Sequence, residues 1–183
     1  RDLEKAGQLI DADRSVNERR YAIEHETFVL IATQQPMAVD LRTLASVLEI
    51  ATELERIGDY AKGIAKITIK MGTEPLVKPL IDIPRMAEKA RNMLQRALQA
   101  FAGRDTDLAR AIPAEDDEMD ALYDQIFREL TTRIMVDPKL VDRASYLIWV
   151  AHNLERAADR VVNICERVIF MVTGEVVEFD DNL

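Results

Sequence analysis

The chain has 183 residues, 48% of them hydrophobic and 31% charged, a balance typical of a soluble protein with a substantial core. Its formal net charge of −9 disfavours nucleic acid and anionic membranes as direct partners and favours cations or basic protein surfaces. Only 5% of the residues are aromatic and a single cysteine is present, which argues against a turn-rich sheet protein, excludes an internal disulfide framework and favours a reducing cytoplasm.

Helical periodicity runs through most of the chain and stops only at proline and glycine. The predicted helices cover, in chain order, residues 1–34, 37–71, 82–102, 105–136 and 139–173. Pro36 ends the first helix, and Pro113 is expected to interrupt the fourth because proline lacks a backbone donor. No apolar run approaches the roughly 20 residues that span a bilayer. The sequence therefore predicts an all-α protein with no membrane-inserted segment.

Local signals mark the ends of the later helices and a boundary between two domains. Asp82 is a plausible N-cap, and Gly103 and Gly174 are plausible C-terminal stops. A loop marked by Gly72, Pro75 and Pro79 precedes Asp82, and Pro84 follows it. We therefore expect a first domain over residues 1–74, a linker over 75–81 and a second domain over 82–183, which ends in an acidic tail.

A short motif occurs twice at a fixed displacement of 100 residues. Five residues of the second helix are repeated in the last one: Ala51, Leu54, Glu55, Arg56 and Asp59 reappear as Ala151, Leu154, Glu155, Arg156 and Asp159. Each copy lies inside a long apolar-periodic stretch, so the repeat indicates a duplicated structural unit.

The two copies differ in the number of helices that they supply. Residues 82–173 provide three helices, whereas residues 1–71 provide two, and a third helix normally covers the flank of an antiparallel pair. We expect two tandem antiparallel three-helix bundles, the first lacking its N-terminal helix in this chain. The uncovered flank is an apolar strip along Leu9, Val16, Ile23 and Leu30. A longer natural chain or a second copy is expected to cover it, and a homodimer is the simplest assembly.

Acidic residues recur at i, i+4 spacing, which places them on one stripe of a helix. The candidate ligands for metal are Asp13, Glu55, Asp59, Asp116, Asp120, Glu155, Asp159 and Glu166. Antiparallel packing is expected to bring Asp116 and Asp120 near Glu155 and Asp159, and oxygen-rich sites of this kind suit Mg, Mn, Ca or Fe. The alternative is a solvated face whose carboxylates pair with neighbours such as Arg56 and Lys62.

One segment resembles a known family. WVAHNLERAADRVVNICERVIFMVTGE (residues 149–175) is similar to the C-terminal signature of the PhoU family, and QPMAVDLR (35–42) resembles that family's entry to its third helix. The resemblance implies two three-helix bundles with repeated acidic motifs on which iron or zinc clusters are known. Asn17 follows Asp13 where an acidic residue belongs, and Lys66 stands at the position equivalent to Glu166. We therefore expect the second bundle to bind a cation, of unknown identity, more tightly than the first.

The resemblance also implies a function. The chain is expected to be a non-enzymatic negative regulator that couples the ATPase subunit of the phosphate-specific ABC transporter to the phosphate-sensing histidine kinase. It would act in the cytoplasm, at the inner membrane only through those partners. The alternative is a carboxylate-rich metal-binding or iron-handling helical protein, which would require bound metal.

Overall fold

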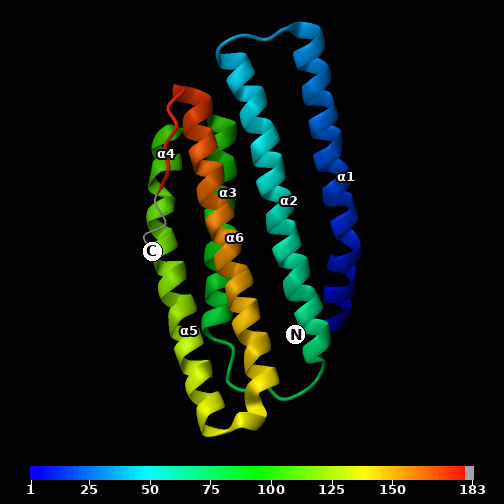
Figure 1. Cartoon of the computed structure of the whole chain (residues 1–183), viewed down its shortest axis with the longest axis vertical. Helices are drawn as coiled ribbons and strands as arrows, with labels where there is room; N and C mark the ends of the chain where they lie inside the picture. Colours follow the sequence, from blue (N-terminus) through cyan, green and yellow to red (C-terminus); the bar gives the residue numbers. More distant parts are fainter. Residues whose placement is uncertain (180–183) are drawn as a thin grey trace.

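The computed structural model describes residues 1–179, and these form a bundle of long helices (Figure 1). The helices are α1 (Leu3–Gln34), α2 (Val39–Met71), α3 (Asp82–Gly103), the short α4 (Thr106–Ala111), α5 (Asp116–Val136) and α6 (Val141–Thr173). No strand occurs among these residues, so the predicted all-α class is confirmed. Within the same range, no helix is both long and apolar enough to cross a bilayer.

Proline stands in three of the connections, as the sequence predicted, with small shifts in the boundaries. The fourth predicted helix is divided into α4 and α5 by a 3₁₀ turn at Pro113–Glu115. A second 3₁₀ turn, Pro138–Leu140, precedes α6, so that helix begins two residues later than predicted. Pro36 lies in the turn between α1 and α2, where Gln35 and Ala38 both take a positive φ of 49°.

Two of the predicted helix ends are wrong. Asp82 is the first residue of α3 rather than its N-cap, and its carboxylate accepts a hydrogen bond from Lys78 instead of a backbone N–H. Gly103 is still helical, and Arg104 takes the left-handed conformation that ends α3. Gly174 does end α6, with a φ of 82° and its N–H bonded to the carbonyl of Phe170 at 2.8 Å.

The main core lies in the second half of the chain. Helices α3, α5 and α6 pack on one another, and α4 covers one end. The largest side chains without solvent exposure all fall between Met86 and Met171. Examples are Met93 on α3, Ile126 on α5 and Ile164 on α6. After α6, Val177 and Phe179 pack back against this core, and the rest of the predicted acidic tail, 180–183, lies outside the described residues.

The first half is a two-helix layer at the edge of the molecule. Helix α1 packs extensively only against α2 (Figure 1), and no side chain of either helix is among the largest fully buried ones. Three members of the predicted strip are open to solvent, since Leu9 is 42% exposed, Ile23 37% and Leu30 45%. The fourth, Val16, is half-buried and faces Gly58 of α2, so that part of the expectation is wrong. The first half therefore supplies two long helices, as predicted, and a further helix that would cover the strip stays a prediction.

Helices α2 and α6 join the two halves along an antiparallel seam. Glu49 of α2 contacts Arg167 of α6, Glu53 contacts Asn163, and further along Gly63 lies beside Asn153. Positions 53 and 153 are equivalent in the repeat, as are 63 and 163. The pairs Glu53–Asn163 and Asn153–Gly63 are therefore the same contact on opposite sides of an approximate two-fold axis. The division into domains at residues 75–81 stays a prediction.

Candidate functional site

The acidic face of the first half lies between α1 and α2. Asp13 is buried, with 8% of its surface exposed, and its Oδ2 is 2.5 Å from the Lys62 ammonium. The same ammonium is 3.8 Å from Asp59, and Asn17 Nδ2 donates to Asp13 at 3.4 Å. The hydrogen bond to Asp13 raises the pKa of Lys62 above its ordinary value. Glu55, one turn before Asp59, is half-buried on α2.

The second acidic face is arranged differently. Glu155 lies 3.3 Å from His152 Nδ1, and Asp159 forms a 2.7 Å ion pair with Arg156. Tyr123 of α5 is close enough that burial, followed by the charge of Glu155, raises the pKa of its hydroxyl. The rings of Tyr123 and His152 lie 5.8 Å apart, so the His152–Glu155 pair stands at the α5–α6 interface.

The other second-half candidates are spread along α5 and α6. Asp116 begins α5 and is half-buried, and Asp120 is exposed one turn later. Glu166 accepts a 2.9 Å hydrogen bond from the backbone N–H of Phe179 in the tail. Across residues 1–179, no three carboxylate, imidazole or thiol groups converge closely enough to share a metal ion. The metal hypothesis therefore stays a prediction.

A polar cluster along the seam between the halves was not predicted. Glu53 is 8% exposed and accepts a hydrogen bond from Arg56 at 2.8 Å. Arg160 of α6 lies 3.6 Å from its other oxygen, and Asn163 donates to that oxygen at 3.4 Å. These residues adjoin two hollows of about 450 and 490 Å³, which share Asn163 and Glu166. The sequence did contain one signal for this cluster: Glu53 lies one turn from both Ile50 and Ile57, so its carboxylate falls on the apolar side of the helix.

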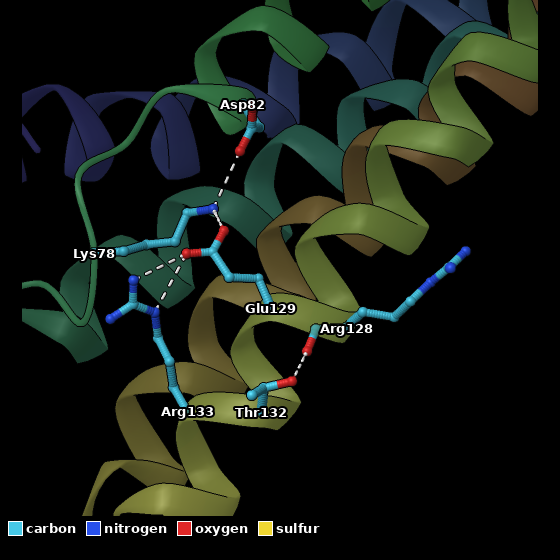
Figure 2. Close-up of polar contacts among 6 residues, drawn as sticks. All are labelled: Lys78, Asp82, Arg128, Glu129, Thr132 and Arg133. Atoms are coloured by element: carbon cyan, nitrogen blue, oxygen red, sulfur yellow. Dashed lines mark hydrogen bonds and ion pairs between the residues drawn. The ribbon is translucent and has the colours of Figure 1, made fainter.

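A second unpredicted cluster fixes the loop between α2 and α3. Figure 2 shows the Lys78 side chain reaching between Asp82 and Glu129, with Arg133 on the far side of Glu129. Lys78 is 7% exposed, its ammonium is 3.1 Å from Asp82 and it is hydrogen-bonded to Glu129. Arg133 holds the other Glu129 oxygen at 3.0 Å. The cluster therefore ties this loop to both α3 and α5.

Fold and site together define an acidic, all-helical protein of two related halves, with carboxylate pairs at equivalent places on two central helices. The model of the PhoU domain matches residues 1–68 and again 83–168. The chain belongs to the PhoU family.

Proteins of similar sequence and structure match nearly the whole chain. A Deinococcus radiodurans protein described as a phosphate-specific transport system accessory protein PhoU homolog is 36% identical, over 92% of this chain and 79% of its own. The crystal structure of PhoU from Pseudomonas aeruginosa has a TM-score of 0.91 at 34% identity and covers 95% of this chain and 84% of that one. The phosphate transport system regulatory protein PhoU from Streptococcus pneumoniae gives 0.89 at 30% identity, covering 97% and 84%.

Proposed function

We propose that this chain is the negative regulator that links the ATPase subunit of a phosphate-specific ABC transporter to a phosphate-sensing histidine kinase in the cytoplasm. The observation that carries the proposal is the match of both halves to the PhoU domain, together with relatives described as accessory to phosphate transport. The chain's net charge of −9 supports basic surfaces on those partners.

The proposed contact surfaces are the two carboxylate faces. Glu55 and Glu155 stand at equivalent positions on α2 and α6, so the two faces can present related surfaces to the two partners. Charges at the rim of such an interface mainly set the association rate and its salt dependence. The binding step is therefore expected to weaken as ionic strength rises.

Complementation tests the proposal. In a bacterium that lacks its own regulator, this chain should restore repression of a phosphate-starvation reporter in phosphate-rich medium. The double variant Glu55→Lys and Glu155→Lys should lose repression, whereas Glu88→Lys with Asp107→Lys, two exposed carboxylates away from both faces, should keep it. Immunoblots must show equal protein levels. Failure of the wild-type chain to repress, at full abundance, would refute the regulatory role.

We also propose that a cation such as Fe, Zn, Mn or Mg binds the second acidic face rather than the first. The residues that would hold it are Asp116, Asp120, Glu155 and Asp159, and their oxygens suit such ions. The supporting observation is the Lys62 ammonium, which pairs with Asp13 on the first face, whereas the position equivalent to Lys62 on α6 is Val162. Asp159→Asn should lower the metal content of the purified protein more than Asp59→Asn does, as measured by elemental analysis.

A further inference from the structure

The Lys62 ammonium lies between carboxylates of two different helices. It is 2.5 Å from Asp13 on α1 and 3.8 Å from Asp59 on α2. Asp13 is more than nine-tenths buried, so its charge requires a nearby cation. Like charges on facing helices would otherwise repel each other or hold a cation between them. In this chain the cation is a side chain.

Asn17 lines the same hollow as Asp13 and Lys62. Besides the two carboxylates, the side chain of Asn17 donates through Nδ2 to Asp13, and its Oδ1 is buried without a hydrogen-bond partner among the described residues. Two carboxylates and an amide oxygen are the kind of donor set that oxygen-preferring divalent cations use. The Lys62 side chain reaches this set from within α2 and excludes another cation from the position where its charge lies.

The repeat supplies an internal comparison. Asp59 and Asp159 are equivalent, but Lys62 corresponds to Val162, whose surface is only 7% exposed. The sequence comparison pointed to Lys66, which is equivalent to Glu166, as the lysine that weakens metal binding in the first half. Lys66 lies one turn beyond Lys62 and is exposed. The residue that neutralises the first face is Lys62 instead, because it is the one that points toward α1.

We propose that Lys62 is a tethered cation that replaces a bound metal ion on the first acidic face, so that this face folds without metal and excludes it. This replacement of a metal ion by a lysine occurs in only one half of the duplicated structure. Any metal dependence of the protein is then confined to the second face. The inference concerns binding and folding in the purified chain, so its test is independent of the phosphate-regulatory role.

The test compares Lys62→Val, which copies the residue of the second half, with Lys66→Val, which removes the same charge one turn away. Thermal unfolding is followed in EDTA and in Mn²⁺, and bound Mn²⁺ is counted after equilibrium dialysis. In EDTA, Lys62→Val should melt below the wild type and Lys66→Val should not. In Mn²⁺, Lys62→Val should regain most of that loss and bind about one more ion per chain than the wild type, because binding to the folded state stabilises it.

Adding Asp13→Asn to Lys62→Val should abolish both the recovery and the extra ion. Asp13→Asn in the chain that keeps Lys62 should leave bound Mn²⁺ unchanged, and this comparison needs no Lys62 variant to fold. Lys62→Gln, which keeps most of the side-chain length, replaces Lys62→Val if the latter does not fold in EDTA. The proposal is overturned if the uncharged variants bind no additional Mn²⁺, if they melt like the wild type in EDTA, or if Asp13→Asn alone removes an ion.

Discussion

Glu53 is buried where the two halves meet, and its charge is matched from both sides of the seam. Arg56 comes from its own helix and Arg160 from α6. Removing Glu53 would leave Arg160, whose side chain is 16% exposed, largely desolvated without this carboxylate, whereas Arg56 is about half exposed and keeps contact with water. Glu53 is therefore the charged side chain of the seam on which stability should depend most.

We predict that Glu53→Ala lowers the free energy of unfolding by about 2–4 kcal/mol. The control is Glu49→Ala one turn earlier, whose ion pair with Arg167 is more exposed and should contribute about 0–1 kcal/mol. Urea unfolding followed by circular dichroism measures both. Equal losses in the two variants would show that burial of Glu53 does not set its contribution.

Sequence reasoning found Glu55 and Glu155 and named Lys62 as a neighbour of the first acidic stripe. It missed Glu53 and the pairing of Lys62 with Asp13 on another helix, and the reason is physical. The repeat marks residues that are the same in both halves, whereas Glu53 and Lys62 correspond to Asn153 and Val162. Their roles depend on which face of α2 turns toward α6 and which toward α1. That rotation is set by the packing of neighbouring helices, which periodicity within one helix does not specify.

At the scale of the elements, the cluster around Lys78 ties the connecting loop to α3 and α5 (Figure 2). The hydrogen bond from Lys78 lowers the pKa of Glu129 below its ordinary value of 4.5. Folding therefore favours the charged carboxylate. Its contribution to stability is fully present above the ordinary pKa and is lost as the pH falls through the lower folded value. Burial opposes the charge of Lys78, but its bonds to Glu129 and Asp82 outweigh that and raise its pKa.

The resulting prediction concerns acid sensitivity. From about pH 7 to about pH 3, the wild type should lose more unfolding free energy than Glu129→Gln, because the variant has no carboxylate to protonate at that site. Glu88→Gln, an exposed carboxylate on α3, should follow the wild-type profile. Urea midpoints measured across the pH range decide the matter. Parallel profiles for Glu129→Gln and the wild type would contradict the assignment.

The helices themselves were largely predictable, whereas their ends were less so. Long apolar periodicity and the prolines at 36, 113 and 138 located every long helix within a few residues. Gly174 fulfilled its expected role, but Gly103 did not, because the left-handed residue that ends α3 is Arg104. Asp82 is a residue type that often caps helices, yet its carboxylate accepts a hydrogen bond from Lys78, four residues earlier in the chain. Such competition between partners is not visible in local sequence.

At the scale of the whole molecule, the edge position of α1 has a measurable consequence. Its outer strip exposes Leu9, Ile23 and Leu30, and large apolar side chains exposed along one helix favour association. We predict that the 183-residue chain self-associates through this strip. Leu9→Glu, Ile23→Lys and Leu30→Glu together should shift it toward the monomer in light scattering and lower its binding of a hydrophobic dye.

The matched control replaces two other exposed apolar residues, Met135 and Val136 at the end of α5, with Glu and Lys. Those substitutions should leave the association unchanged. A wild-type chain that is strictly monomeric and binds no dye would contradict the prediction that the strip mediates self-association.

The antiparallel pairing of α2 with α6 has the geometry of a symmetric dimer whose two subunits have become one chain. In a true dimer, every substitution appears twice, once on each side of the axis, so a residue must suit both places at once. A covalent link removes that constraint. Glu53 can face Asn163 on one side while Asn153 faces Gly63 on the other, and Lys62 can appear once without a second copy. Fusion thus lets two equivalent surfaces acquire different chemistry while the seam between them keeps one shared register.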